Sequence, residues 1–383
     1  MFYADANAGV PSSERHLKQV FRLLQESDGN PSSMHKYGRK ARVAIETARR
    51  DICSYLHIDS EKFIFTSGGT ESNNLIIHAF AAPHAQSSEL PHILITAGDH
   101  PSIRNTAQTL AEQQRCALDT IPITKAGIVA VEQLPKLVRP NTVLACLTHA
   151  NSETGVINPV ADIASAIKEL NPNTHVHCDA VQALGKIELN DSLSTNAQLD
   201  SASFSAHKLG ALKGCGGLYL KNSLPRAQMY GGSHEFNLRA GTENLAGIIS
   251  FGCVVKALPD QLSRWQQHVA GLKSILLEEL ATTDALMLAG DSPCLPNTVY
   301  VHLPRTKVED LILNLDLAGI AVSSGSACSS GISRPSTTLT QMGYDSQIAS
   351  NALRISFGQQ GTADDVKKML VILKKCWASK PRN

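Results

Sequence analysis

Short apolar runs alternate with longer amphipathic stretches over the first 250 residues of the chain. Between residues 39 and 56, apolar side chains such as Ile45 and Ile52 recur at three- and four-residue steps, which predicts an amphipathic helix. Segments such as 71–80 and 159–170 are also compatible with helices. The short apolar runs predict strands at residues 62–66, 92–96, 142–148, 175–178, 200–205 and 217–220. Strands that alternate with helices predict an α/β domain with a mostly parallel, buried sheet.

The pattern changes after about residue 250, where longer helical stretches surround a few strands. These stretches lie at residues 262–280, 307–317 and 363–377. They predict a second, smaller α/β domain, which we expect to include the first dozen residues as well. The predicted large domain therefore spans residues 14–253, and the predicted small domain spans residues 1–13 and 254–383.

Composition narrows the class of protein further. Of the 383 residues, 43% are hydrophobic and 18% are charged, which is enough apolar material for a sizeable core. A formal net charge of +1 gives no electrostatic basis for binding nucleic acid. No signal peptide or apolar run of about 20 residues is present, so we expect no membrane segment. Nine cysteines without a CxxC pair favour a reducing cytoplasm and argue against zinc ribbons and other metal sites.

The segment Ser67-Gly-Gly-Thr-Glu-Ser72 joins a predicted strand to a predicted helix. Glycines allow the backbone to approach an anion, a helix N-terminus offers unpaired N–H groups, and hydroxyls add donors. The segment is of neither the Walker nor the GxGxxG type. It is compatible with a phosphate cradle and equally with an ordinary glycine-containing helix start.

Lys208 closes the predicted strand in Ser203-Phe-Ser-Ala-His-Lys208. The carboxyl ends of strands are where α/β folds place ligand-binding groups. A desolvated lysine at such a position can bind a carbonyl group covalently. The alternative is a solvated surface lysine, which is the more common situation for a lysine chosen blindly.

Asp179 and His100 follow other predicted strands, in His177-Cys-Asp-Ala-Val-Gln182 and Gly98-Asp-His-Pro101. The aspartate could pair with a pyridinium nitrogen, or it could cap the following helix. The histidine ring could stack on a planar cofactor, although a lone histidine is more often structural.

Cys328 lies in a run of small residues, Ser323-Ser-Gly-Ser-Ala-Cys-Ser-Ser-Gly331. Such a run cannot build a rigid core, so it predicts a flexible loop with an accessible thiol. Accessibility is one of the two requirements for a reactive cysteine, and a lowered pKa is the other. The remaining eight cysteines lie mostly in apolar or strand contexts, which predicts inert, buried thiols.

Taken together, these signals describe a phosphate cradle, a carbonyl-binding lysine, an acid for a ring nitrogen and a stacking ring. The cofactor that requires all four is pyridoxal 5′-phosphate. Over nearly its whole length the sequence resembles the NifS/IscS-type cysteine desulfurases of the class V aminotransferase family. The motifs that carry the resemblance are Asp5-Ala-Asn-Ala8, Gly29-Asn-Pro-Ser-Ser33, residues 65–74, Asp99-His-Pro101, Cys178–Gln182, Ser205-Ala-His-Lys208, Arg239–Asn244, the Cys328 loop and Arg354–Gly358.

The resemblance implies a homodimer of fold type I, with the cofactor bound in the large domain and the catalytic cysteine loop in the small one. By matching positions, it implies a covalent cofactor link and Cα base at Lys208, ring stacking by His100, and contacts to the ring nitrogen and phenolic oxygen by Asp179 and Gln182. The implied phosphate ligands are Gly69, Thr70, Ser205, His207 and, from the other subunit, Thr242. Arg354 would bind the substrate carboxylate.

The implied reaction converts L-cysteine to L-alanine. The Cys328 thiolate attacks the substrate sulfur, and the resulting persulfide is passed to an acceptor protein. A selenocysteine lyase and a class V transaminase are the alternatives among enzymes. A catalytically inactive scaffolding subunit is the alternative outside them, although the presence of Lys208, Asp179, His100 and Cys328 argues against it.

Two segments depart from the family pattern. Asn151-Ser-Glu153 stands where the family has Asn-Asn-Glu, so Ser152 replaces an asparagine that contacts cofactor or substrate. We expect Asn151 or Asn30 to compensate. Near the N-terminus, Ala8-Gly-Val-Pro11 lacks the two threonines of the family.

The chain also ends soon after the helical stretch at residues 363–377. Family members that serve an iron–sulfur scaffold extend further, and the extension helps to dock the scaffold. We therefore expect a different sulfur acceptor, such as one in DNA phosphorothioation or tRNA thiolation, with an iron–sulfur pathway as the alternative.

Overall fold

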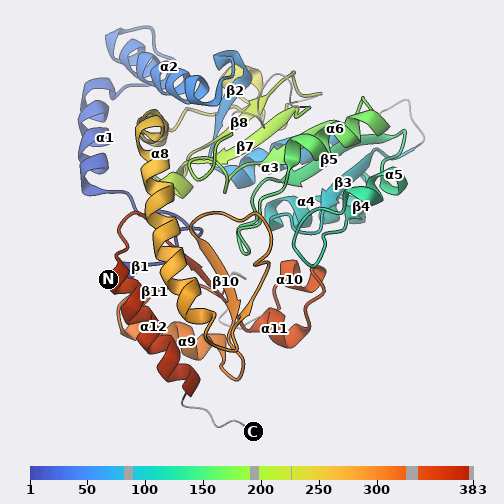
Figure 1. Ribbon diagram of the computed structural model, residues 1–383. Helices are drawn as coiled ribbons and strands as arrows, with labels where there is room; N and C mark the ends of the chain where they lie inside the picture. The colour runs from blue at the N-terminus through green and yellow to red at the C-terminus, as the bar shows by residue number, and fades with distance from the viewer. Residues whose placement is uncertain (82–88, 190–197, 226, 325–334, 379–383) are drawn as a thin grey trace.

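The structure is a computed structural model that describes residues 1–81, 89–189, 198–225, 227–324 and 335–378. A seven-stranded sheet with the order β2-β8-β7-β6-β5-β3-β4 forms its larger part (Figure 1). β8 runs in the direction opposite to that of the other six strands. The strands are β2 (Phe63–Thr66), β3 (His92–Thr96), β4 (Ala117–Ile121), β5 (Thr142–Thr148), β6 (His175–Asp179), β7 (Ser201–Ser205) and β8 (Gly216–Leu220). The prediction of a mostly parallel α/β sheet is confirmed.

Both faces of this sheet are buried, and successive strand residues alternate between two cores. On β2, Phe63 and Phe65 belong to one apolar cluster and Ile64 to the other. Leu94 on β3 likewise lies opposite Ile93. The strands therefore read as continuous apolar runs, because helices cover both sides.

Helices from different parts of the chain form the two covers. The first face is covered by α2 (Lys36–Leu56), α6 (Val160–Leu170) and α8 (Leu245–Leu280), and the second by α3 (Gly69–Phe80) and α4 (Pro101–Glu112). Helix α1 (Glu14–Ser27) packs against α2 and α8. Shorter elements are α5 (Leu134–Leu137) and the 3₁₀ turns η1 (Ser60–Lys62), η2 (Val131–Gln133), η3 (Ala206–Leu209) and η4 (Glu235–Asn237).

A smaller unit with its own apolar core lies beside the large sheet (Figure 1). Its three-stranded antiparallel sheet has the order β12-β10-β9, and a parallel pair joins β1 to β11. Its strands are β1 (Phe2–Tyr3), β9 (Leu286–Met287), β10 (Thr298–His302), β11 (Ile320–Ala321) and β12 (Ala352–Ser356). Its helices are α9 (Val308–Leu317), α10 (Thr337–Gln341), α11 (Ser346–Ser350) and α12 (Ala363–Ala378). The first residues thus pair with this unit.

Helix α8 begins at Leu245, well before the helical stretch predicted from residue 262. Its first half contains Gly252 and Pro259, which obscured the pattern. A side chain at Gly252 would meet Ala48 of α2 at 2.6 Å, so the glycine is needed for close helix packing. The predicted domain boundary at residues 253–254 falls inside this helix, and that division stays a prediction.

Among the described residues, α8 alone is long and apolar enough to cross a membrane by length and composition. Half of its most apolar window is buried inside the protein. It also packs along α2 and α12 and contributes Phe251 to the main core. We therefore interpret it as a core helix.

The contribution of His177 to the stability of the folded protein depends on pH. Burial lowers the pKa of His177 to about 3, so the folded protein holds the ring neutral, bonded to Ser201 Oγ at 2.7 Å and to Asn73 Oδ1 at 3.0 Å. The unfolded chain takes up a proton below its ordinary value of 6.5, so this contribution to stability is lost as the pH falls from 6.5 toward about 3.

We predict that the stability gap between the wild type and His177→Asn narrows over this pH range. Urea unfolding of both proteins at several pH values measures the gap. A gap that does not change with pH would contradict the prediction.

Candidate active site

Lys208 lies in the turn η3, directly after the carboxyl end of β7. Its ammonium group donates to the carbonyl oxygens of Asn7 at 2.7 Å and Ala8 at 3.0 Å. Burial and the nearby charge of Arg354 lower the pKa of Lys208 to about 8, while Asp5 and Asp179 act in the opposite direction. The lysine is therefore much closer to its neutral, nucleophilic form at physiological pH than a surface lysine.

Asp179 ends the neighbouring strand β6, and its carboxylate is buried at the same edge of the sheet. One carboxylate oxygen accepts from Asn73 Nδ2 at 2.9 Å and the other from the backbone N–H of Val181 at 3.0 Å. The side chain is thereby held in one orientation. It is suited to face a cationic ring nitrogen.

His100 caps helix α4, where its Nδ1 accepts from the backbone N–H of Ser102 at 3.1 Å. The Ser102 hydroxyl also receives a bond from Asn73 at 2.9 Å, so His100 and Asp179 belong to one connected network. The ring is open to solvent on one side, yet desolvation by the surrounding protein lowers its pKa. The sequence left open whether His100 has a structural role or a role in cofactor binding. The helix cap is a structural role, and the cofactor role stays a prediction.

The glycine-rich segment forms the N-terminus of α3. Gly68 provides no side-chain cap, so the first N–H groups, including those of Gly69 and Thr70, have no side-chain partner there. A side chain at Gly69 would meet Val181 at 2.4 Å, so only glycine lets the helix start approach the segment after β6. The positive end of this helix favours an anion.

Two further polar side chains follow β7 beside this helix start. The Ser205 hydroxyl lies 2.9 Å from Nδ1 of His207. Burial, with the charges of Lys208 and Lys213, lowers the pKa of His207 to about 4. A neutral imidazole keeps one N–H, and the bond within the pair uses one of its two donor hydrogens, so the pair offers one donor, from either the hydroxyl or the imidazole.

Arg354 reaches the site from β12 of the smaller unit. Its side chain is 5% exposed, and its two terminal nitrogens donate to Asp5 Oδ1 at 2.6 Å and to the Ser152 carbonyl oxygen at 3.1 Å. Its Nε is buried without a hydrogen-bond partner among the described residues. An anion that binds here therefore competes with Asp5 and the Ser152 carbonyl for the guanidinium group.

Sequence reasoning missed a group of polar residues behind Lys208, of which Asn7 is the centre. Its backbone oxygen accepts from Gln182 Nε2 at 2.9 Å as well as from Lys208. Its side-chain oxygen accepts from the buried Lys186 at 2.7 Å. Two features of the sequence could have indicated this group. Asn7 lies in the Asp5-Ala-Asn-Ala8 motif, and Lys186 follows Gln182 by four residues in an apolar segment.

The other predicted site residues have different surroundings. The Asn151 side-chain oxygen accepts from the backbone N–H groups of Glu153 and Thr154, both at 2.9 Å, so it is taken up by its own loop. Asn30 is exposed and accepts from Ser32 N within the loop between α1 and α2, which Figure 1 shows far from the three-stranded sheet. Thr242 is exposed in the loop before α8. Their substrate and cofactor contacts stay predictions.

Cys328 lies outside the described residues, so its predicted mobility and accessibility are not tested. The described residues on either side of it are bonded to Glu153 and Tyr300. The Glu153 carboxylate accepts from Ser336 Oγ at 2.5 Å and Thr338 Oγ1 at 3.0 Å. The Tyr300 hydroxyl donates to Glu153 at 3.3 Å and to the Ser324 carbonyl oxygen at 3.4 Å. Glu153, from the large unit, thus bonds directly to the chain after the cysteine segment and is linked through Tyr300 to Ser324 before it.

Five of the eight described cysteines are buried. Burial raises the pKa of Cys53 to about 11 and that of Cys215 to about 12. It holds the pKa values of Cys146 and Cys178 well above the ordinary range. These four thiols stay protonated at neutral pH, as predicted for inert cysteines. The less buried ones are Cys253, Cys294 and Cys376.

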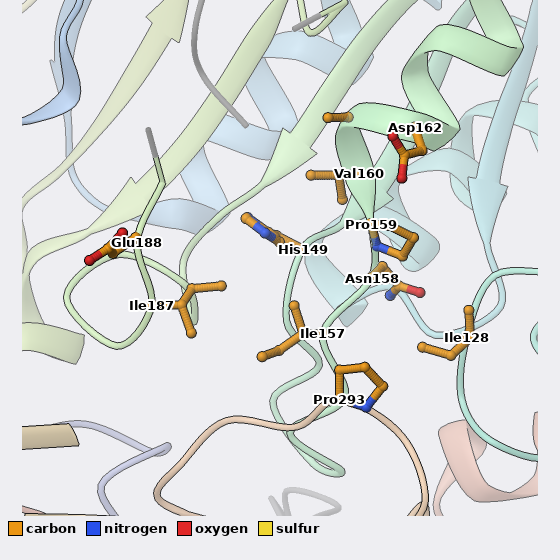
Figure 2. A pocket seen from close by; sticks show the side chains of 11 residues that line it. Ile128, His149, Ile157, Asn158, Pro159, Val160, Asp162, Ile187, Glu188 and Pro293 are labelled. Atoms are coloured by element: carbon orange, nitrogen blue, oxygen red, sulfur yellow. The ribbon is translucent and has the colours of Figure 1, made fainter. Parts of the chain in front are cut away.

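A separate hollow of about 610 Å³ opens beside the N-terminus of α6 (Figure 2). Its wall is largely apolar, with Ile128, Ile157 and Pro293 on one side and His149 at its centre. Burial lowers the pKa of His149 to about 4, so the ring is neutral. None of the predicted site residues lines this hollow. The candidate active site lies instead at the carboxyl ends of β6 and β7.

The donor set at the strand ends fits pyridoxal phosphate. A helix N-terminus with a hydroxyl or imidazole donor suits its phosphate, Asp179 suits its ring nitrogen, and Lys208 suits its aldehyde. The buried, partnerless Nε of Arg354 adds a cationic donor for a carboxylate. The fold and site together define the class: an α/β enzyme of fold type I.

Comparison with known proteins specifies the family. The aminotransferase class-V family model matches residues 2–369. The cysteine desulfurase IscS of Dictyoglomus turgidum is 34% identical over 377 residues, which cover 97% of this chain and 93% of that protein. A solved structure described as a NifS-like protein superposes with a TM-score of 0.88 at 32% identity, covering 98% of each chain. A structure described as SspA in complex with cysteine has a TM-score of 0.80 at 28% identity, covering 93% of this chain and 99% of that one.

The chain therefore belongs to the class-V aminotransferase family, and its curated relatives are named as cysteine desulfurases of the IscS and NifS types. The family resemblance expected from the sequence motifs is confirmed. The enzymes of this family depend on pyridoxal phosphate.

The role of Glu153 leads to a prediction about stability. Replacement by alanine leaves the Ser336, Thr338 and Tyr300 hydroxyls without their shared acceptor, and we expect the free energy of unfolding to fall by about 1–3 kcal/mol. Urea unfolding followed by far-UV circular dichroism measures this loss.

A matched control is Glu279→Ala, which removes an exposed carboxylate paired with Lys374. It should change the same quantity by less than about 1 kcal/mol. Equal losses of unfolding free energy in the two variants would contradict the prediction, because Glu153 would then stabilise the fold no more than an exposed carboxylate does.

Proposed function

We propose that the protein is a pyridoxal-phosphate-dependent cysteine desulfurase, which converts L-cysteine to L-alanine and carries the sulfur as a persulfide on Cys328. The observation that carries the proposal is that Lys208, Asp179 and Arg354 lie close together at one edge of the large sheet. The relatives that match this chain over nearly its full length are named as cysteine desulfurases. The complex of the related SspA with cysteine supports the choice of substrate.

The residues of this chain would hold the cofactor in a defined way. Lys208 binds it covalently, Asp179 pairs with its ring nitrogen, and His100 stacks on its ring. Gln182 donates to its phenolic oxygen. The phosphate is bound by Gly69, Thr70, Ser205 and His207, with Thr242 contributed by a second copy of the chain in a homodimer. When bound, pyridoxal phosphate supplies an electron sink for the charge that develops at Cα.

The protein groups would then handle the substrate. Arg354 binds the carboxylate of cysteine, which displaces Asp5 or the Ser152 carbonyl from the guanidinium. The Lys208 amine, released from the cofactor when the substrate amine takes its place there, would take the proton from Cα and return protons to the product. The Cys328 thiolate forms a bond to the substrate sulfur as the Cβ–S bond breaks, and Cβ gains a proton to give alanine. Asn151, Ser152 and Asn30 are proposed substrate contacts.

The sulfur then passes to an acceptor protein. We propose a cytoplasmic location, which the free thiols of the five buried cysteines support. The acceptor belongs to a DNA phosphorothioation, tRNA thiolation or iron–sulfur pathway. Direct binding to nucleic acid or to a membrane is not part of the proposal.

The first test of the proposed function is the replacement Cys328→Ala. We expect wild-type protein to release alanine from L-cysteine and sulfide in the presence of dithiothreitol. The variant should keep the visible absorbance band of bound cofactor and lose at least about a hundredfold in rate, because the thiolate nucleophile is gone. Alanine assay with absorbance spectroscopy measures both properties.

The half-buried Cys253 provides the control, since Cys253→Ala should retain wild-type turnover. Full activity of Cys328→Ala would instead indicate a transaminase, and activity confined to selenocysteine would indicate a selenocysteine lyase. A wild type without a cofactor band would indicate an inactive scaffolding subunit.

The lowered pKa of Lys208 leads to a second test. An amine must be unprotonated to bind an aldehyde, so the rate of covalent attachment of pyridoxal phosphate to apoprotein should rise with pH through about 8 and then level off. Stopped-flow absorbance measures this rate. In Arg354→Gln the midpoint should move upward, because the neighbouring positive charge is removed. A wild-type midpoint near 10.5, the ordinary value for lysine, would contradict the prediction.

A further inference from the structure

Lys186 is a second lysine behind the proposed cofactor site. It follows Gln182 by four residues and is 2% exposed. Lys186 and Lys208 line one small cavity of about 100 Å³ that also contacts α8. A lysine so deeply buried is rare unless a partner compensates for its loss of hydration.

The partners of Lys186 are neutral oxygens. Its Nζ donates to Asn7 Oδ1 at 2.7 Å and to Gln182 Oε1 at 2.5 Å. Within the described part of the chain, no carboxylate lies within ion-pair distance of it. Burial, followed by the charges of Lys208 and Arg354, holds the pKa of Lys186 well below its ordinary value. An ion pair therefore does not explain why a lysine occupies this position.

The consequence of these contacts is a fixed orientation of the Gln182 amide. Nζ donates to both oxygens, and even a neutral amine keeps two N–H donors, so in either protonation state Gln182 presents its oxygen to Lys186. Its Nε2 then points the other way, where it donates to the Asn7 carbonyl oxygen at 2.9 Å. Lys208 donates to the same oxygen at 2.7 Å. Lys186 thus determines which end of the amide lies next to Lys208.

We propose that Lys186 is a positioning residue that holds the N–H end of Gln182 toward the phenolic oxygen of the cofactor. The proposal rests on the proposed function. It adds a role for a side chain that does not itself touch the cofactor. Without Lys186, the amide is free to turn its oxygen toward the phenolic oxygen, and two acceptors then face each other.

The test is an equilibrium titration of apoprotein with pyridoxal phosphate, read by absorbance. Lys186→Met keeps the length and apolar stem and removes the donors. We expect its dissociation constant to rise about tenfold, as for the loss of one hydrogen bond that a site relies on. The control is Lys273→Met, because Lys273 is a half-buried lysine on α8 that bonds only the Leu295 carbonyl among the described residues. This control should bind the cofactor like the wild type.

A double-mutant comparison separates positioning from general stabilisation. In a Gln182→Met background, Lys186→Met should change the dissociation constant by less than about twofold, because the amide through which it acts is gone. A tenfold effect that persists in this background would overturn the proposal. So would a folded Lys186→Met single variant with the wild-type dissociation constant.

Gln182→Glu provides a test that does not depend on the folding of Lys186→Met. It gives Lys186 a carboxylate partner but presents an oxygen to the cofactor, so binding should weaken at least about tenfold. Wild-type affinity of this variant would overturn the proposal. If wild-type protein itself shows no cofactor band, the proposed function fails, whereas a normal wild type beside unaffected variants rejects only the role of Lys186.

Discussion

The buried amide of Asn7 is the interaction on which the geometry of the site depends. The residue is 1% exposed, and its backbone and side-chain polar atoms are all bonded. It joins Ser356 and Thr298 of the smaller unit to the lysines behind the large sheet. Because a buried polar atom without a partner costs free energy, any shift of one unit against the other breaks bonds here. Asn7 is therefore one of the residues that set the relative position of the two sheets and of Lys208.

A second constraint is electrostatic. Lys186, Lys208 and Arg354 bring three basic groups together, and Asp5 and Asp179 oppose them. Removal from water disfavours the charged form of each amine, and neighbouring positive charge acts in the same direction. This arrangement accounts for a nucleophilic amine near neutral pH without a dedicated base beside it. It also leaves three basic groups beside two acidic ones in this part of the protein.

The sequence allowed prediction of the features that depend on local patterns. Apolar runs marked the strands of the parallel sheet, and Lys208, Asp179 and His100 were chosen because each lies at or shortly after the end of a predicted strand. Parallel strands bring such residues to one edge. The start of α8 was missed because its glycine serves packing against a distant helix, a contact that has no local signature.

Residues whose roles arise from long-range contacts could not be predicted. Nothing around Lys186 or Glu153 in the sequence indicates which distant oxygen or hydroxyl will be their partner. Asn7 meets Ser356 across 349 positions of the chain. Asn30 and Asn151 were chosen by resemblance, and here they bond mainly within their own loops. Long-range pairing depends on the completed fold, which local patterns do not encode.

The pairing of the first residues with the last strands has a consequence for biosynthesis. β1 and Asn7 find their partners only after β11 and β12 have been made. At about 5–20 residues per second, a ribosome needs roughly 20–70 s to cover that separation. The start of the chain must wait through this interval while the large sheet folds. Completion of the site is therefore a late step of folding, and Phe2 stays without its strand partner until the C-terminal strands emerge.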